Sequence, residues 1–320
     1  MSLHTDIVGA RSVKARHAAD EETPLISLTD ITEIELLILR RMREMTIGDH
    51  RSLAHGSGFD FVGLRDWQPG DRSASIDWAQ SSIKNFSPLV VREFEQPSTA
   101  TVMVVADDSL STRCGVGGVP IARGIARGIA TIGMSAVFFQ DMFGLLTFSG
   151  GQTLSAIRPQ IGRNQVMHCL DAYETRRGLQ ELKHASSLST AISSFMRKTA
   201  LVPFISDFLF DGPETVIREL ALVNTTHDVF VVLVDAAFAF EMPAVSSGWI
   251  DAVDIETGRT RMMSRQAMAG MAQRVRDWQD HVARLAHDAD LDVVRIGPEA
   301  AGSDLALSEF VAERRLRKVA

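Results

Sequence analysis

Apolar runs alternate with amphipathic stretches through most of the chain after residue 97. Runs rich in Val, Ile, Leu and Phe occur at 100–106, 143–148, 201–205, 229–234 and 291–296. Stretches with helical spacing of apolar residues lie between and after them, at 120–136, 164–176, 187–198, 213–223, 264–288 and 305–318. Short apolar strands that alternate with helices indicate a mostly parallel sheet covered on both faces. We therefore predict a doubly wound, Rossmann-like α/β domain over residues 98–320.

The part of the chain before this domain has a different pattern. Residues 1–25 are polar, mixed in charge and aperiodic, and we expect a flexible tail. A helix fits residues 30–46, with Asp30 as its N-cap. Residues 56–97 are rich in Gly, Ser, Asp and Trp, and they end in the alternating run PLVVREFE. This composition predicts short strands joined by turns, so residues 26–97 form a helix followed by a small β-rich appendage.

Composition and charge are those of a globular protein that does not bind nucleic acid. The chain is 45% hydrophobic and 23% charged, as in ordinary globular proteins. Its formal charge of −7 at pH 7, without a Lys/Arg-rich stripe, argues against binding of duplex nucleic acid. A single tyrosine and scattered phenylalanines argue against a platform on which bases stack. We therefore expect no nucleic-acid partner.

Cysteine usage and hydropathy indicate the compartment. Cys114 and Cys169 are the two cysteines, with no CxxC spacing, so a disulfide framework or a structural zinc site is not expected. The longest uncharged apolar run, at 128–139, is shorter than the about 20 residues that span a bilayer. The N-terminal residues lack the apolar core of a signal peptide. We expect a cytoplasmic chain without a membrane span.

Candidate chemistry lies at the ends of the predicted strands. The stretch VVADDSLST places Asp107, Ser109 and Ser111 directly after the first strand. Asp207 follows the strand at 201–205 in the same way. In an open α/β sheet, ligands bind beyond the carboxyl ends of the strands, at a switch in strand order. A third group of hydroxyls opens a predicted helix, at Ser186, Ser187, Ser189 and Thr190.

Two carboxylates and several hydroxyls at one edge of a sheet suit a hard, octahedral cation such as Mg²⁺ or Mn²⁺. Because serine and threonine are neutral ligands, the two aspartates balance the charge of the ion, and an open position can take a carboxylate from a partner. The third hydroxyl ligand is Ser186, with Ser187 and Thr190 as alternatives. The competing interpretation is structural, since aspartate and serine after a strand also cap helices and form turns.

The arrangement resembles the metal-ion-dependent adhesion site of von Willebrand factor type A domains. The resemblance rests on the D-x-S-x-S motif, a following serine or threonine, and the aspartate of a Ser-Asp step. The segments GFDFVGLRDWQPGD, IDW and VVREFE resemble the bacterial family catalogued as domain of unknown function fifty-eight, over roughly 30–320. The resemblance implies metal contacts from Asp107, Ser109, Ser111 and Asp207, with Ser186 where threonine is usual.

The same resemblance carries an implication about partners. Members of the family are typically encoded beside MoxR-type AAA ATPases, which implies such an ATPase, and its client protein, as partners. Many members also carry N-terminal transmembrane helices, and this chain shows none in its sequence. A form free of the membrane is therefore expected.

The Gly-Asp and Ile-Asp-Trp steps of the β-rich segment have two interpretations. Asp71 and Asp77 can bond backbone amides in tight turns, with Trp67 and Trp78 packed beneath them. Alternatively, the segment presents a partner-binding surface that includes Arg65 and these four residues. The residues alone do not decide between the two.

Two classes of function fit these features. The first is a non-enzymatic, metal-dependent interaction module that serves a MoxR-type AAA ATPase in the assembly or maturation of other proteins. The second is a metal-dependent hydrolase of a phosphate or acyl substrate, since Mg²⁺ between aspartates can activate water. A serine where a phosphotransferase would want a second carboxylate, at Ser109, argues against the second class. The absence of a G-x-S-x-G elbow also argues against a serine hydrolase.

Overall fold

The computed structural model describes residues 8–10, 24–48, 60–69, 71, 73, 76–95, 99–149, 153–182, 187–196, 198–241, 249–254, 259–297 and 300–317. The chain divides into two compact units. Residues 1–39 and 100–320 form the first, and residues 40–99 form the second. Helix α1 (Leu28–Gly48) begins in the first unit, so its N-terminal half groups with the α/β part of the chain.

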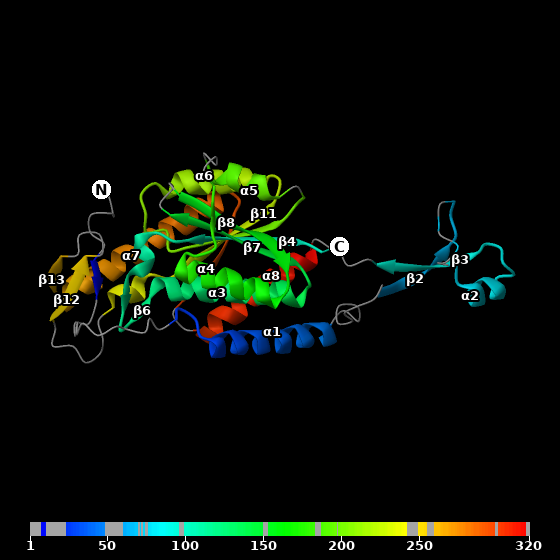
Figure 1. The fold of residues 1–320 in the computed structure, drawn as a ribbon, viewed down its shortest axis with the longest axis horizontal. Coiled ribbons are helices and arrows are strands. Elements are labelled where there is room, and N and C mark those ends of the chain that lie inside the picture. Colours follow the sequence, from blue (N-terminus) through cyan, green and yellow to red (C-terminus); the bar gives the residue numbers. More distant parts are fainter. Residues whose placement is uncertain are drawn as a thin grey trace. The chain divides into compact units, whose positions relative to one another are not determined.

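A seven-stranded sheet forms the centre of the first unit (Figure 1). Its strand order is β14-β11-β10-β4-β7-β8-β9, and neighbours from β14 to β7 are parallel while β8 and β9 are antiparallel. This mostly parallel sheet confirms the predicted α/β class. The strands are β4 (Thr101–Asp107), β7 (Met142–Ser149), β8 (Thr153–Ile161), β9 (Gln180–Glu181), β10 (Leu201–Ser206), β11 (Asp228–Val234) and β14 (Asp292–Ile296).

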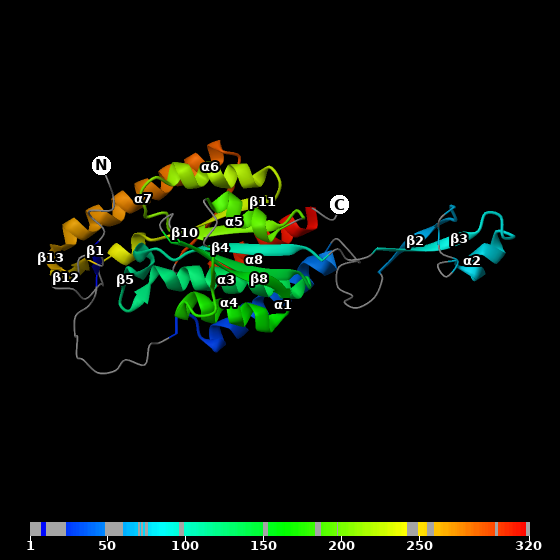
Figure 2. The same ribbon diagram turned by 45° about the horizontal axis from the view of Figure 1, so that its top comes forward.

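Helices cover both faces of this sheet (Figure 2). One face carries α3 (Ile121–Phe138), α4 (Arg163–Thr175) and α8 (Ala300–Arg317). The other carries α5 (Leu188–Phe195), α6 (Pro213–Asn224) and α7 (Arg265–Asp288). All six were predicted, and α8 begins five residues before its expected start at 305. The doubly wound arrangement follows, because the apolar strands are buried on both sides.

Helix α3 lies close against the sheet because small residues face it. A Cβ atom on Gly124 would stand 2.9 Å from the Val234 Cγ1, and one on Gly128 would stand 3.3 Å from the Ile205 Cδ1. Among the described helices, α3 is long and apolar enough to cross a membrane, and 72% of that stretch is buried inside the fold. It is therefore packed as a core helix of this unit.

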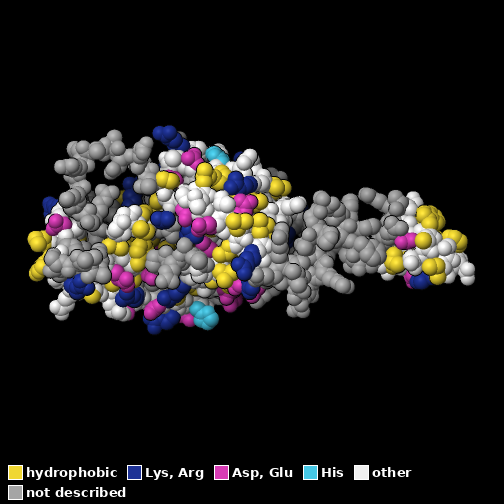
Figure 3. Space-filling view, turned by 90° about the horizontal axis from the view of Figure 1, so that it is seen from below, with side chains coloured by type: hydrophobic (Ala, Val, Ile, Leu, Met, Phe, Trp, Pro, Cys, Tyr) yellow, Lys and Arg dark blue, Asp and Glu magenta, His cyan; other side chains and the backbone are white. Residues whose placement is uncertain are grey.

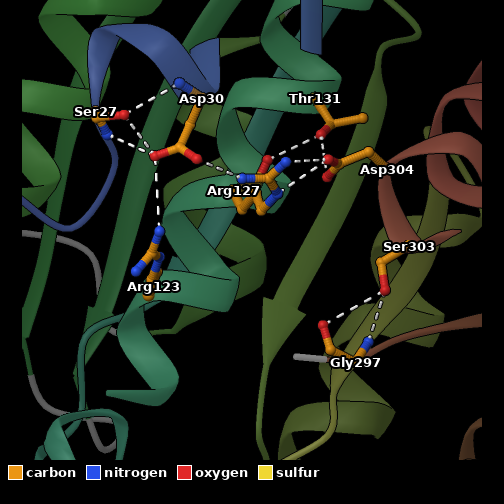
Figure 4. Close-up of polar contacts among 8 residues, drawn as sticks. All are labelled: Ser27, Asp30, Arg123, Arg127, Thr131, Gly297, Ser303 and Asp304. Atoms are coloured by element: carbon orange, nitrogen blue, oxygen red, sulfur yellow. Dashed lines mark hydrogen bonds and ion pairs between the residues drawn. The ribbon is translucent and has the colours of Figure 1, made fainter. Parts of the chain in front are cut away.

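The first turn of α1 is fastened by an ionic network (Figure 4). The Arg127 guanidinium donates to Asp304 Oδ2 at 2.7 and 2.9 Å and to Asp30 Oδ1 at 3.0 Å, joining α3 to both α8 and α1. Thr131 donates to the other oxygen of Asp304, at 3.1 Å. Ser27, rather than the predicted Asp30, caps the helix: its hydroxyl accepts from the Asp30 amide, and the Asp30 carboxylate accepts from the Ser27 amide.

Several elements differ from the sequence predictions. Val8–Ala10, assigned to the flexible tail, form strand β1, which pairs with β12 (Trp249–Asp254) beside β13 (Thr260–Ser264). Gly117 and Gly118 form the turn of a tight hairpin between β5 (Gly115–Val116) and β6 (Val119–Pro120). Gly117 and Gly118 have φ of 62° and 83°, the left-handed values that such a hairpin turn requires.

The second unit contains a small two-stranded sheet, as the sequence predicted. Strand β2 (Asp60–Asp66) pairs antiparallel with β3 (Val90–Glu95). Between them, α2 (Trp78–Ile83) is a short helix where strands were expected. The Asp77 side chain caps this helix by accepting from the Gln80 amide, which favours a helical turn over a strand.

Candidate metal centre

Two aspartates meet at the point where the strand order of the sheet reverses. Strands β4 and β10 are parallel neighbours, with Ala106 paired to Ile205. The chain continues from β4 to β7 on one side and from β10 to β11 on the other. Asp107 therefore ends β4 beside Asp207, which follows β10, at the carboxyl edge where α/β sheets bind ligands.

The Asp107 carboxylate is fully buried and held by neighbouring groups. Its Oδ1 accepts from the Ser109 amide at 2.8 Å, and its Oδ2 accepts from the Ser206 hydroxyl at 2.5 Å. The Ser206 hydroxyl in turn accepts from the Phe208 amide at 2.8 Å. Tyr173 of α4 donates its hydroxyl to the Asp107 carbonyl at 2.8 Å. These contacts fix both the backbone and the carboxylate of Asp107.

Ser109 and Ser111 connect the two aspartates. Their hydroxyl oxygens lie 2.9 Å apart, and the Ser111 hydroxyl donates to Asp207 Oδ1 at 3.2 Å. Both serines are almost completely buried. The structure thus brings four of the five predicted ligands into one polar cluster at the end of β4.

Asp207 has one oxygen that lacks a hydrogen-bond partner. Its Oδ1 accepts from Ser111 and from the Leu209 amide, but its buried Oδ2 accepts from no described group. An unpaired buried acceptor is costly and calls for a ligand. The next residue, Phe208, has φ of 56°, a strained conformation for a bulky side chain.

Burial raises the pKa of both carboxyl groups. The pKa of Asp207 rises to about 7 because the group is desolvated and because Asp107 carries a like charge beside it. Desolvation also raises the pKa of Asp107, against the hydrogen bonds from Ser206 and Ser109. Two ionised carboxylates in this place repel one another in a medium of low polarity. A divalent cation would relieve both the desolvation and the repulsion.

The donor set fits a hard ion. Among the described residues, no three or more His, Cys, Asp or Glu side chains gather closely enough to hold a metal ion together. Sulfur or nitrogen ligands are therefore not part of this cluster. Two carboxylates and two hydroxyls supply oxygen donors only, and Mg²⁺ and Mn²⁺ prefer these. The unpartnered Oδ2 of Asp207 supplies a free ligand atom.

The third hydroxyl is not decided. Ser186 lies outside the described residues. Ser187 is the N-cap of α5, and its hydroxyl accepts from the Thr190 amide at 3.2 Å. The Thr190 hydroxyl interacts with the Ser187 backbone in return. Since both alternatives are occupied in a capping box, the assignment of Ser186 stays a prediction.

Two supporting residues were missed in the sequence. Ser206 belongs to the Ser-Asp step that drew attention to Asp207, and successive side chains of a strand point to opposite faces. That alternation predicts that the Ser206 and Asp207 side chains point in opposite directions. It could not show that Ser206 donates a hydrogen bond to Asp107. Tyr173 lies 66 positions from Asp107, on a helix, and no local pattern connects the two.

The two aspartates of the predicted partner surface in the second unit have structural roles. Arg65 binds Asp71 through two hydrogen bonds, at 2.8 and 2.7 Å, and the Gln68 amide donates to the same carboxylate. The Arg65 hydrogen bonds lower the pKa of Asp71 to about 2. Trp67 and Trp78 are 38% and 59% exposed, which disagrees with the interpretation in which both tryptophans pack beneath the turns.

A mostly parallel sheet with helices on both faces and an aspartate–serine cluster at its switch point defines a doubly wound α/β domain. The chain belongs to the family described as protein of unknown function DUF58, whose model matches residues 63–306. No curated protein matches the sequence.

Two bacterial structures illustrate what the chain is similar to. The conserved hypothetical protein BatB from Bacteroides thetaiotaomicron is 16% identical, with a TM-score of 0.38, over 68% of this chain and 99% of that one. The pilus adhesin SpaC from Lactobacillus rhamnosus GG is 10% identical, with a TM-score of 0.35, over 70% of this chain and 30% of that one.

Proposed function

We propose that this protein is a non-enzymatic, metal-dependent interaction module. The observation that carries the proposal is the buried pair Asp107 and Asp207 at the switch point, with Asp207 Oδ2 unpartnered among the described residues. Two buried carboxylates held this way favour binding of a cation, because neither has a positive charge beside it within the cluster.

The roles of the residues follow from their positions. Asp107, Ser109, Ser111 and Asp207 would hold Mg²⁺ or Mn²⁺ through oxygen atoms. An ion held there would supply a Lewis-acidic position at which a carboxylate of a partner protein could bind. Ser206 orients the Asp107 carboxylate, and Tyr173 holds the Asp107 backbone.

The proposed partner is a MoxR-type AAA ATPase, with its client protein, in the cytoplasm. This finer assignment rests on the family resemblance in the sequence rather than on a contact. We expect the purified chain and the candidate ATPase to form a complex with Mg²⁺ that dissociates in EDTA, as measured by sedimentation velocity. A complex of equal strength in EDTA would sink the metal-dependent part of the proposal.

Calorimetric titration with Mg²⁺ and Mn²⁺ tests the ion site itself. We expect saturable binding to the wild-type protein and none to Asp107→Ala, with thermal melts showing that both are folded. Asp108→Asn is the matched control, because the neighbouring Asp108 carboxylate pairs with Arg176 at 2.6 Å outside the cluster. Binding that survives Asp107→Ala, or that is lost in Asp108→Asn, would contradict the assigned ligands.

The second candidate function, a metal-dependent hydrolase, has one observation in its favour. The pKa of Asp207, raised by burial to about 7, is near the value that a general base needs at neutral pH. We expect no turnover of p-nitrophenyl phosphate or p-nitrophenyl acetate with Mn²⁺ present. Turnover that Asp207→Asn abolishes would replace the interaction module with the hydrolase.

A further inference from the structure

The three-stranded sheet β1-β12-β13 lies at the same edge of the first unit as the metal centre. Strand β1 contacts β5 and the short helix η4 (Ala237–Phe240), which follow the carboxyl ends of β4 and β11. Strand β13 leads directly into α7. The hairpin of β12 and β13 therefore extends the surface on which a partner would meet the metal centre.

A groove of ≈ 390 Å³ runs between this hairpin and the first turns of α7. Its apolar lining comes from Trp249, Met262, Met263 and Met271. Trp249 is 57% exposed and Met262 is 68% exposed. Apolar side chains are visible at the end of the first unit where β12 and β13 lie (Figure 3). A volume of this size holds a few side chains, so it suits a segment of a protein rather than a whole domain face.

Two arginines border the groove. Arg261 of β13 and Arg274 of α7 are exposed, and neither pairs with a carboxylate of a described residue. By contrast, Arg276 on the same helix is already paired, to Glu241. Unpaired guanidinium groups beside an apolar groove favour carboxylates on whatever fills it.

We infer that this groove docks an acidic, amphipathic segment of a partner protein. Apolar side chains of the segment fill the space between Trp249 and the methionines, and its carboxylates pair with Arg261 and Arg274. Methionine is flexible and polarisable, which lets such a groove accept apolar side chains of different shape. The inference goes beyond the proposed function, because docking here requires no metal ion.

A designed peptide tests the inference in EDTA, so that the outcome is independent of the ion site. The probe is a fluorescein-labelled helix of about four turns, with leucines on one face and glutamates on the other. We expect saturable binding to the full chain by fluorescence polarisation. Arg274→Glu should weaken it at least tenfold, and Met262→Lys should do the same; both positions are exposed, so folding is preserved.

Exchanging the charges of the peptide and the groove is a more specific test. A peptide with lysines in place of the glutamates should bind Arg274→Glu better than it binds the wild type. Arg284→Glu, at an exposed position further along α7, is the matched control and should leave binding of the acidic peptide unchanged. No binding, equal binding of both peptides, or a concentration-dependent dimer that Met262→Lys dissolves would overturn the inference, the last in favour of a second copy of this chain.

Discussion

At the scale of single residues, Asp207 makes stability depend on pH. Its pKa in the folded protein is raised by burial to about 7 from an ordinary value of 3.8, so the folded state holds a proton that the unfolded chain has already released. The contribution of Asp207 to the free energy of unfolding is therefore greatest below pH 4 and falls as pH rises through 7, by about 4 kcal/mol for a shift of this size. Urea unfolding in EDTA across this range measures the decline.

Asp207→Asn is the control for this prediction. The amide is neutral throughout, so the part of the decline that comes from Asp207 should be absent and the variant should be more stable than the wild type at pH 7.5 in EDTA. An identical decline in both proteins would mean that Asp207 is not the group responsible.

The sequence pointed to the two aspartates of this cluster because their positions carry physical meaning. Asp107 and Asp207 each follow a strand too apolar to be exposed, and a carboxylate there needs a reason. The pairing of β4 with β10 was not readable, since strand order depends on contacts between residues about 100 positions apart. The unpartnered Oδ2 of Asp207 likewise appears only once the backbone has been folded.

At the scale of elements, the close approach of α3 to the sheet predicts the effect of added methyl groups. Gly124→Ala places a Cβ 2.9 Å from Val234, and we expect a loss of about 1–3 kcal/mol in the free energy of unfolding. Gly302→Ala in α8 meets nothing within 4 Å and should stabilise by up to about 1 kcal/mol. Urea denaturation compares the two. A stabilised Gly124→Ala would mean that α3 shifts freely.

The ionic network at α1 gives a second prediction for an element. Arg127→Met leaves Asp304, whose side chain is 5% exposed, without its cation, and we expect a loss of about 3–5 kcal/mol. The double variant Arg127→Met with Asp304→Leu removes both charges and should recover most of that loss. Chemical denaturation of the two single variants and the double variant measures the coupling. Losses that simply add would show that the pair is not coupled.

Each element that the sequence missed lacks a local signal that marked the other elements. Strand β8 runs antiparallel on the edge side of a parallel sheet, and its alternating residues lack the continuous apolar run that marked the other strands. Helix α2 is too short for a helical period to show, and its Asp77 cap resembles a turn. The residues of β13 are exposed or half-buried, so burial did not enrich this strand in apolar residues.

At the scale of the whole molecule, the effect of the ion should be confined to one unit. Mg²⁺ at roughly 100 times its dissociation constant stabilises the state that binds it by about 2.7 kcal/mol. Hydrogen exchange followed by mass spectrometry should then slow at the ends of β4 and β10, including the amides of Ser109 and Leu209 that bond the two carboxylates. Peptides from β2, α2 and β3 should exchange at unchanged rates. Uniform protection of both units would contradict a local site.

Because Tyr173 contacts Asp107, it is a suitable position for an NMR probe. The chain contains one tyrosine, and its hydroxyl donates to the backbone of the first proposed ligand at 2.8 Å. Burial raises the pKa of this phenol well above 10, so it stays protonated and keeps donating at any working pH. Biosynthetic incorporation of fluorotyrosine would therefore yield a single ¹⁹F resonance from the proposed metal centre. Its chemical shift would follow occupancy by the ion, or arrival of a partner, without a substitution anywhere in the sequence.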